Sequence, residues 1–304
     1  MKSKQDKFSI VAFRYSILHT SPQEKGQITI DPKGSSITKE DAFRNILEEV
    51  FVKNNKTTSC IDEGKVIYKT LFKHKPSHDD YVFQFAKETT KEIFEETDDG
   101  FSAKSIDSYP NTVVALNIPS QICFIEPTSS FSNNVTTIAN AFSKCISSQL
   151  KHSGYPFRVK MEAMTSTHDF WEIAQAHEGE IKELEFHLLS PNFLGANYEA
   201  REVLNTIKEE TGTEETTIKF KNSDGNLKIS GKTVTEAVKW IASGCGRWSI
   251  TTKGKTYKSE NTPISTSIKD DLRTQKKEDA YDTIKAALAI LEDIENENKN
   301  TQSD

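Results

Sequence analysis

Long apolar runs are missing from this sequence. Among its 304 residues, uninterrupted apolar stretches such as 10–13 and 113–116 are short, whereas a membrane-spanning helix needs about 20 consecutive apolar residues. The basic first ten residues, MKSKQDKFSI, are followed by no long apolar segment either, which argues against a secretory signal. We therefore expect no transmembrane helix and a cytosolic location.

Cysteine is scarce as well. The four cysteines, Cys60, Cys123, Cys145 and Cys245, are scattered and show no Cys-x-x-Cys spacing. This pattern argues against a disulfide framework and against a zinc site, and we expect mostly buried thiols. Gly244-Cys245-Gly246 is too short for a phosphate-binding loop and marks the end of a helix. No motif indicates a cofactor, and we expect none.

The chain does have enough bulky apolar residues for a core. Hydrophobic residues make up 35% and charged residues 28% of it, with seventeen phenylalanines and three tryptophans, so it is polar but not disordered. Its length suits one large domain or two ordinary ones. We expect an N-terminal α+β domain over 1–154, a second α+β domain with a basic surface over 155–255, and a loop, a C-terminal helix and a disordered tail over 256–304.

Hydrophobic periodicity predicts an α+β fold with mainly antiparallel sheets, packed helices and a C-terminal helix. Two segments lack a regular pattern and are expected to be irregular: 88–107, which is acidic, and 256–268, which is rich in Ser, Thr and Asn. Period-two alternation and β-branched or aromatic runs predict strands at 8–20, 65–73, 81–86, 112–118, 121–126, 157–164, 180–188, 216–221, 227–230 and 247–253. Capped stretches with one apolar face predict helices at 37–53, 135–151, 169–177, 196–211, 233–243 and 278–295.

The strongest functional signal is a basic block at 219–258. Nine cations against Asp224 and Glu236 give it a local charge of 9 − 2 = +7 in a chain whose total is −6. Such a block is typical of a surface that meets an anionic partner, most commonly a nucleic-acid backbone. Its cations are Lys219, Lys221, Lys228, Lys232, Lys239, Arg247, Lys253, Lys255 and Lys258.

An acidic segment lies directly before the basic block. Residues 172–218 contain eleven acids and three lysines or arginines, a net charge of 3 − 11 = −8. The two segments could therefore neutralise each other, within one chain or between chains, instead of binding an external partner.

A second basic strand is expected at 65–73. Lys65, Lys69 and Lys73 share one face at a spacing of four, so they could follow a phosphate backbone. Lysines also protect edge strands from aggregation, and this alternative stays open.

Aromatic residues are interleaved with the cations of the basic block. Trp240, Trp248 and Tyr257 stand beside lysine or arginine, an arrangement that suits base stacking on single strands. Trp240 also falls in an expected helix, where it could belong to the core. Without a helix-turn-helix or zinc module, binding independent of base sequence is favoured.

Two groups of residues resemble metal ligands. His74 and His78 precede Asp79 and Asp80, but Pro76 prevents the helix that would direct both histidines to one metal ion. Glu183, Glu185 and His187 share one face of a strand, but Phe186 stands where the common metal nucleases have lysine. We expect no metal site. A metal-dependent nuclease remains an alternative that requires carboxylates converging with His74, His78 or His187.

One segment carries a resemblance to a known family. Ile181-Lys182-Glu183-Leu184-Glu185-Phe186-His187-Leu188-Leu189-Ser190-Pro191-Asn192 is expected to be a strand ending in a Pro-Asn turn. It resembles the core of an uncharacterised bacterial domain family often found near phage-defence genes. The order of elements over 109–255 is similar to that family and, in layout, to the Rex exclusion sensor of lambdoid phages.

The resemblance implies a cytosolic, non-enzymatic, DNA-binding protein that forms a dimer and cooperates with a second, often membrane-embedded, effector. Combined with the basic block, it leads to the hypothesis of a sensor for phage defence that binds DNA phosphates without reading bases. The expected contacts are Lys219, Lys221, Lys228, Lys232, Lys239, Arg247, Lys253 and Lys255, with Lys65, Lys69 and Lys73 as a second set. The alternative to both DNA binding and the nuclease is a protein scaffold that assembles through its complementary acidic and basic segments.

Overall fold

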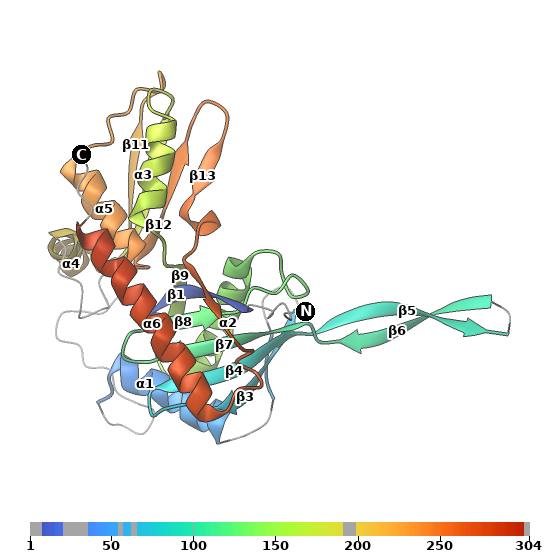
Figure 1. Cartoon of the computed structure of the whole chain (residues 1–304). Coiled ribbons are helices and arrows are strands. Elements are labelled where there is room, and N and C mark those ends of the chain that lie inside the picture. The colour runs from blue at the N-terminus through green and yellow to red at the C-terminus, as the bar shows by residue number, and fades with distance from the viewer. Residues whose placement is uncertain are drawn as a thin grey trace.

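The chain folds into two larger antiparallel sheets with packed helices and a separate two-stranded ribbon, and the α+β class is confirmed (Figure 1). The computed structural model describes residues 8–20, 36–53, 57–61, 66–98, 100–190 and 199–300. Among these residues, no helix combines the length and apolar character needed to cross a bilayer.

The larger sheet has eight strands in the order β14-β1-β8-β7-β4-β3-β2, and β9 also pairs with β1. Antiparallel pairing runs throughout it. Its strands are β1 (Phe8–His19), β2 (Thr58–Ile61), β3 (Ile67–His74), β4 (Asp80–Lys87), β7 (Asn111–Asn117), β8 (Ile122–Ile125), β9 (Phe157–Ala163) and β14 (Ser265–Ile268).

Both faces of the large sheet are buried. Helices α1 (Lys39–Ile46) and α2 (Val135–His152), with the π-helical turn η1 (Leu47–Val52), cover one face, and α6 (Lys277–Asn300) covers the other (Figure 1). In β1, Phe13 joins the core under α2 while its neighbour Ala12 joins the core under α6. Burial on both faces explains why this strand is apolar without alternation.

The smaller sheet has the strand order β11-β10-β12-β13. Its inner face carries Phe186 and Trp248, which form a core with Trp240. Both tryptophans are buried, and the indole of Trp240 donates to the Leu189 carbonyl at 3.1 Å, so they serve the core and not base stacking. The elements are β10 (Glu183–Leu189), β11 (Glu215–Lys221), β12 (Gly246–Thr251) and β13 (Thr256–Lys258), with α3 (Thr167–Ala176), α4 (Glu199–Thr211) and α5 (Lys232–Ala242).

Residues from both sides of position 154 share the large sheet, because β9 pairs with β1 over seven residues. The helix α6 also contacts both parts of the molecule. Asn298 at its end accepts hydrogen bonds from the Thr167 amide and hydroxyl, both at 2.9 Å. Arg14 of β1 forms an ion pair with Glu295 of α6.

Several local predictions are wrong. The acidic segment 88–107 is not irregular but forms two strands of a ribbon, β5 (Thr89–Thr97) and β6 (Gly100–Ser108). The segment 256–268 contains β13, the short helix η2 (Ser259–Asn261) and β14, which extends the edge of the large sheet beside β1. The expected strand at 227–230 is absent, because only Asn226 makes an isolated bridge, to Ile181.

The expectation of unpaired cysteines is also wrong for one pair. Cys60 of β2 and Cys145 of α2 form a disulfide with their Cα atoms 5.5 Å apart. The sequence separation of 85 residues hid this contact, which arises because α2 packs across the sheet near β2. Cys123 and Cys245 are buried thiols as expected, and burial raises the pKa of each.

Candidate nucleic-acid interface

The outer face of the small sheet is charged because β10 alternates with period two. Leu184, Phe186 and Leu188 point into the core, so the alternate residues Glu183, Glu185 and His187 face the other way. Antiparallel register places Lys221 opposite Glu183 and Lys219 opposite Glu185 on β11. It places Arg247 of β12 opposite His187. The face therefore combines residues from the acidic and the basic segments of the sequence.

These charges pair within the chain. Lys219 Nζ lies 2.7 Å from Glu183 and 2.6 Å from Glu185, and Lys221 Nζ lies 3.0 Å from Glu183. His187 Nε2 lies 2.5 Å from Glu185. Hydrogen bonds from Lys219, followed by those from Lys221, lower the pKa of Glu183, and hydrogen bonding to Lys219 is the main cause that lowers the pKa of Glu185. Part of the basic block is thus neutralised by the acidic segment, as the intramolecular alternative predicts.

The pairing continues onto β9. Arg247 lies 3.4 Å from Glu162, whose side chain is only 6% exposed, and Lys160 lies 3.3 Å from the same carboxylate. Burial raises the pKa of Glu162, while Lys160 and Arg247 oppose that shift. Beside this group is a cavity of about 380 Å³ lined by Glu185, His187, Arg247, Trp248, Ser249, Lys258 and Glu260. Arg247 is therefore held at the junction of the two sheets by acids.

A less neutralised group of lysines lies at one end of the small sheet. The backbone brings four segments together there. The Lys182 amide donates to the Thr251 carbonyl at 2.9 Å, the Lys182 carbonyl accepts from the Asn222 amide at 2.9 Å, and Asn226, two residues before Lys228, forms a bridge with Ile181. Thr252 likewise donates to the Lys255 carbonyl at 2.9 Å, closing the β12–β13 turn. We call this group the basic end; it consists of Lys182, Lys221, Lys228, Lys253 and Lys255.

The basic end holds lysines whose side chains face solvent. Its five lysines lie near Glu180, Glu183 and Asp224 in the sequence or in strand register, and Lys228 also lines a cavity of about 890 Å³ together with Glu172 and Glu178. Lys228, Lys253 and Lys255 are exposed, and within the described ranges no acid lies within ion-pair distance of them. Lys255 does lie 4.5 Å from the centre of the Tyr257 ring. Sequence reasoning missed Lys182, because it belongs to the acidic segment and only strand pairing brings it here.

The remaining candidate cations lie elsewhere. Lys232 and Lys239 are on α5, the helix that packs on the inner face of the sheet. Lys69 of β3 is 2.9 Å from Glu88 and 4.4 Å from the Tyr109 ring centre, whereas Lys73 is exposed. Lys65 lies outside the described residues. β3 lies between β2 and β4 and is not an edge strand, so its lysines do not protect an edge.

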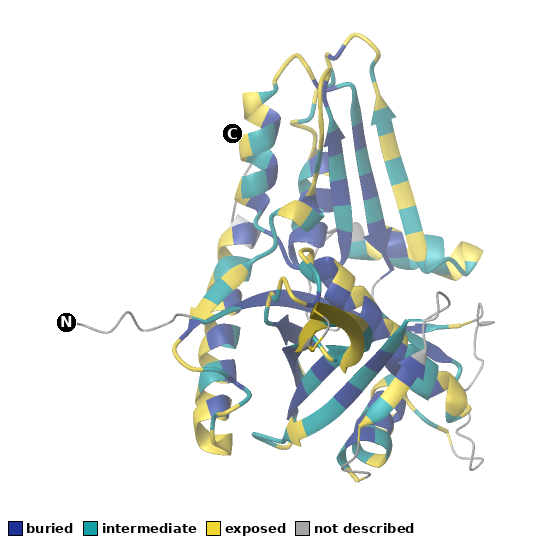
Figure 2. Cartoon of the chain, turned by 90° about the vertical axis from the view of Figure 1, so that its right-hand side faces the viewer, coloured by how far each residue is buried: buried dark blue, intermediate teal, exposed yellow. Residues whose placement is uncertain are grey.

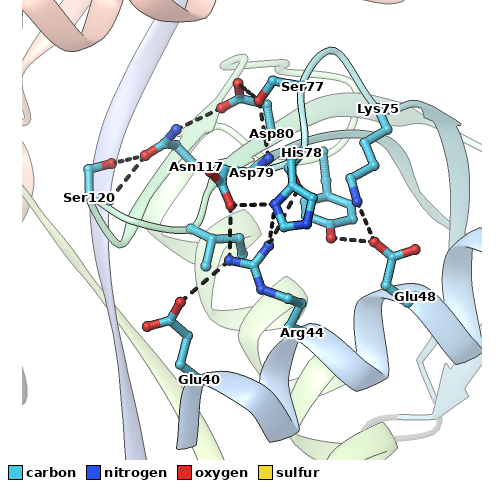
Figure 3. Close-up of polar contacts among 12 residues, drawn as sticks. Glu40, Arg44, Glu48, Lys75, Ser77, His78, Asp79, Asp80, Asn117 and Ser120 are labelled. Carbon is cyan, nitrogen blue, oxygen red and sulfur yellow. Dashed lines mark hydrogen bonds and ion pairs between the residues drawn. The ribbon is translucent and has the colours of Figure 1, made fainter.

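The residues considered for a metal site do not converge. His74 Nε2 faces the Leu272 carbonyl at 3.3 Å, while the His78 ring lies beside Asp79, which binds Arg44 at 2.9 Å (Figure 3). Asp80 is buried and accepts from Ser77 and Asn117. Over the parts of the chain that the structure describes, no three His, Cys, Asp or Glu residues are grouped so that they could hold a metal ion.

This polar cluster has a structural explanation. Lys75 and the Tyr81 hydroxyl both bind Glu48 at 2.5 Å, and Arg44 binds Asp79, so the helix α1 and the turn η1 are fastened to the β3–β4 turn (Figure 3). Burial is the largest single influence on the pKa of Glu48 and raises it. Hydrogen bonds from Lys75 and Tyr81, with the charges of Lys75 and Arg44, outweigh burial together and lower the pKa below its ordinary value.

Comparison with known proteins gives one match. No curated protein sequence and no solved structure shows significant similarity to the chain. A family model described as a domain of unknown function, DUF4747, matches residues 120–286, from the β7–β8 turn through the small sheet and into α6. Since the match covers more than half of the 304 residues, the chain belongs to the DUF4747 family.

Proposed function

We propose that this protein binds the backbone of nucleic acid through the basic end of the small sheet, without reading base sequence. The observation that supports the proposal is the convergence of four segments at this end, which places Lys228, Lys253 and Lys255 in solvent with their charges available. Lysine binds phosphate as a mobile point charge and gives affinity without base discrimination. A short, exposed group of this kind suits contact along one edge of a duplex or a single strand.

The structure narrows the set of expected contacts. Phosphates would compete with Glu183 and Glu185 for Lys219, and with Glu162 for Arg247. Bringing a phosphate into such a pair places it beside a carboxylate, which is unfavourable. The same argument applies to Lys221, which is paired with Glu183. The proposal therefore rests on Lys228, Lys253 and Lys255, with Lys182 beside them.

The biological setting of this proposal is phage defence. It rests on the resemblance of 109–255 to a domain family found near phage-defence genes and to the Rex exclusion sensor. In that setting the protein is a non-enzymatic sensor, and nucleic-acid binding passes a signal to an effector of the same system, in many cases a membrane-embedded one.

The test is a salt titration of binding to a labelled duplex and a labelled single strand. We expect the variant Lys228→Gln/Lys253→Gln/Lys255→Gln to bind more weakly, with a slope of log affinity against log salt that is flatter by up to about 2.7 on duplex DNA, since each lost phosphate contact contributes about 0.9. The matched control, Lys269→Gln/Lys276→Gln/Lys277→Gln, removes the same charge from exposed positions outside the small sheet and should change binding little. Equal affinity and slope for the two triple variants would contradict the proposal.

Divalent metal belongs in the same titration, with the substrate checked for cleavage. Magnesium- or manganese-dependent cleavage that survives further purification would contradict a non-enzymatic function and favour the nuclease alternative.

Protein–protein assembly is a second candidate function, favoured by a different observation. The acidic and basic segments that were expected to hold a partner pair with each other inside the chain. The ribbon formed by β5 and β6 has an ion pair of its own, Lys104 with Glu95 at 3.0 Å, but it leaves Phe94 and Phe101 exposed.

A further inference from the structure

The ribbon of β5 and β6 extends away from the body of the protein (Figure 1). Its two strands pair with each other over nine positions and, within the part of the chain that the structure describes, with no other strand. Large apolar side chains on it are exposed to solvent: Phe94 is 69% exposed and Phe101 is 78% exposed, and the ribbon is coloured mostly as exposed in Figure 2. A two-stranded ribbon alone is at best marginally stable in water. An exposed pair of aromatics on such an element is typical of an interaction site.

The register gathers the two aromatics on one face. Phe94 of β5 is opposite Ala103 of β6, and Glu96 of β5 is opposite Phe101 of β6. The two pairs are two residues apart along each strand. Because alternate residues share a face, Phe94, Phe101 and Ala103 form an apolar strip with Glu92 and Glu96 beside it. The strip is therefore both apolar and acidic.

Charge decides against pairing between two such ribbons. Residues 89–108 contain six acids and two lysines, a net charge of 2 − 6 = −4. Two copies of the ribbon laid face to face would bring these acids together, and like charges oppose that contact. The surface that receives the ribbon must instead be basic, with a hollow for an aromatic ring.

The same chain carries such a surface between β2, β3 and α2. A pocket of about 290 Å³ is lined by Tyr68, Phe157, Ala141 and the Cys60–Cys145 pair, and no acid lines it. Its polar lining includes the cations Lys144, Lys151 and Arg158. Lys144 and Lys151 are exposed, and Arg158 contacts Glu214 and Glu215. An apolar cavity of about 150 Å³ holds a benzene molecule, so this pocket has room for a phenylalanine ring.

We propose that the ribbon docks onto this basic pocket of a second copy of the chain, with Phe94 or Phe101 inserted between Tyr68 and Phe157. The acids Glu92 and Glu96 then lie near Lys144 and Lys151. A strand of nine residues spans roughly 30 Å, which lets the ribbon reach across to a neighbouring molecule. Exchange about a two-fold axis makes the contact twice, and both complementary surfaces are supplied by one sequence. The inference does not depend on nucleic-acid binding, because the basic end takes no part in it.

The test is sedimentation of the full-length protein over a range of concentrations at low and high salt. We expect a wild-type dimer that weakens with salt. Phe94→Ser/Phe101→Ser should raise its dissociation constant more than about tenfold, as hot-spot aromatics do. The control Val203→Ser/Ile290→Ser removes two other exposed apolar side chains and should leave the dimer intact. Circular dichroism melting confirms that each variant is folded.

Reversing the charges on the pocket and on the ribbon provides a second, independent test. Lys144→Glu/Lys151→Glu should also yield a monomer, and combining it with Glu92→Lys/Glu96→Lys should restore association. A wild-type protein that stays monomeric at every concentration, or a dimer that both double variants leave unchanged, would overturn the proposal. Neither outcome would affect the proposed nucleic-acid binding, which the salt titration tests separately.

Discussion

Replacing Arg14 with methionine should destabilise the protein by about 3 kcal/mol, toward the lower end of the 3–5 kcal/mol typical of a broken buried ion pair. Arg14 is 2% exposed, and its guanidinium donates to the Ser243 carbonyl, to the Ser120 carbonyl at 2.8 Å and to Glu295 at 2.5 Å. Methionine keeps much of the apolar stem but supplies no donor, so two carbonyls and a carboxylate lose a partner. Glu295 is 22% exposed, and water restores part of its hydration, which places the estimate at the low end.

The assay is urea unfolding, combined with amide hydrogen exchange. Arg14 connects β1 to α6 and to the segment around residue 243. Amide exchange should therefore accelerate in those two segments more than in β4 and β7. Glu295→Gln, which keeps an acceptor for the guanidinium, should cost less than Arg14→Met. A loss below about 1 kcal/mol, the range of an exposed ion pair, or unchanged exchange in α6, would refute the idea that Arg14 fastens the helix.

Three further predictions concern the backbone, the disulfide and pH. Gly246→Ala should cost about 3 kcal/mol or more in urea unfolding, because φ is +150° and an added Cβ would lie 2.1 Å from the His187 carbonyl oxygen; Gly254→Ala, with nothing within 4 Å, is the matched control. Cys60→Ala should lower stability by up to about 4 kcal/mol in oxidising buffer, from the entropy of a long cross-linked loop, and by clearly less when dithiothreitol is added to both proteins. Burial, with Lys39 and Lys208, lowers the pKa of His19 to about 4, so the unfolded chain binds more protons between pH 6.5 and 4, and stability decreases as the pH is lowered through this range; His19→Gln should flatten this part of the curve of unfolding free energy.

Most regular elements could be predicted from the sequence because their signals are local. The period-two pattern around Leu184 and Phe186 predicts β10, and the apolar stripe from Ile284 to Leu291 predicts α6. Both elements bury the face that their pattern indicates, so burial and periodicity agree there.

The ribbon was not predicted from the sequence because its strands lack the hydrophobic periodicity by which the other strands were predicted. β5 and β6 bury neither face, so no alternation of apolar and polar residues marks them, and the acids suggested a loop. Gly100, the first residue of β6, adopts a φ of +125°, which its lack of a side chain allows. A strand without a core is specified by its partner strand and its turn, which a scan for hydrophobic periodicity does not weigh.

The candidate site shows a different limit. Local composition identified the basic block, but the net charge of a surface depends on which strands are neighbours. Because β10 pairs with β11, Glu183 and Glu185 lie against Lys219 and Lys221, and a block of +7 becomes a mostly neutral face with a small basic end. No reading of either segment alone contains that information, and Lys182 enters the basic end for the same reason.

The pairing of β10 with β11 also explains why weak ion pairs on the outer face form between defined residues. A slip of one residue would turn Phe186 toward solvent and Glu185 toward the core, so the core and the outer ion pairs require the same register. Phe186→Ala should therefore cost about 3–5 kcal/mol, as for other fully buried phenylalanines, whereas Lys219→Met on the exposed face should change stability little. If Lys219→Met proved the more damaging of the two in urea unfolding, the charges and not the core would set the register. The charged face would then be a structural element, and a function in binding would have to come entirely from the basic end and the ribbon.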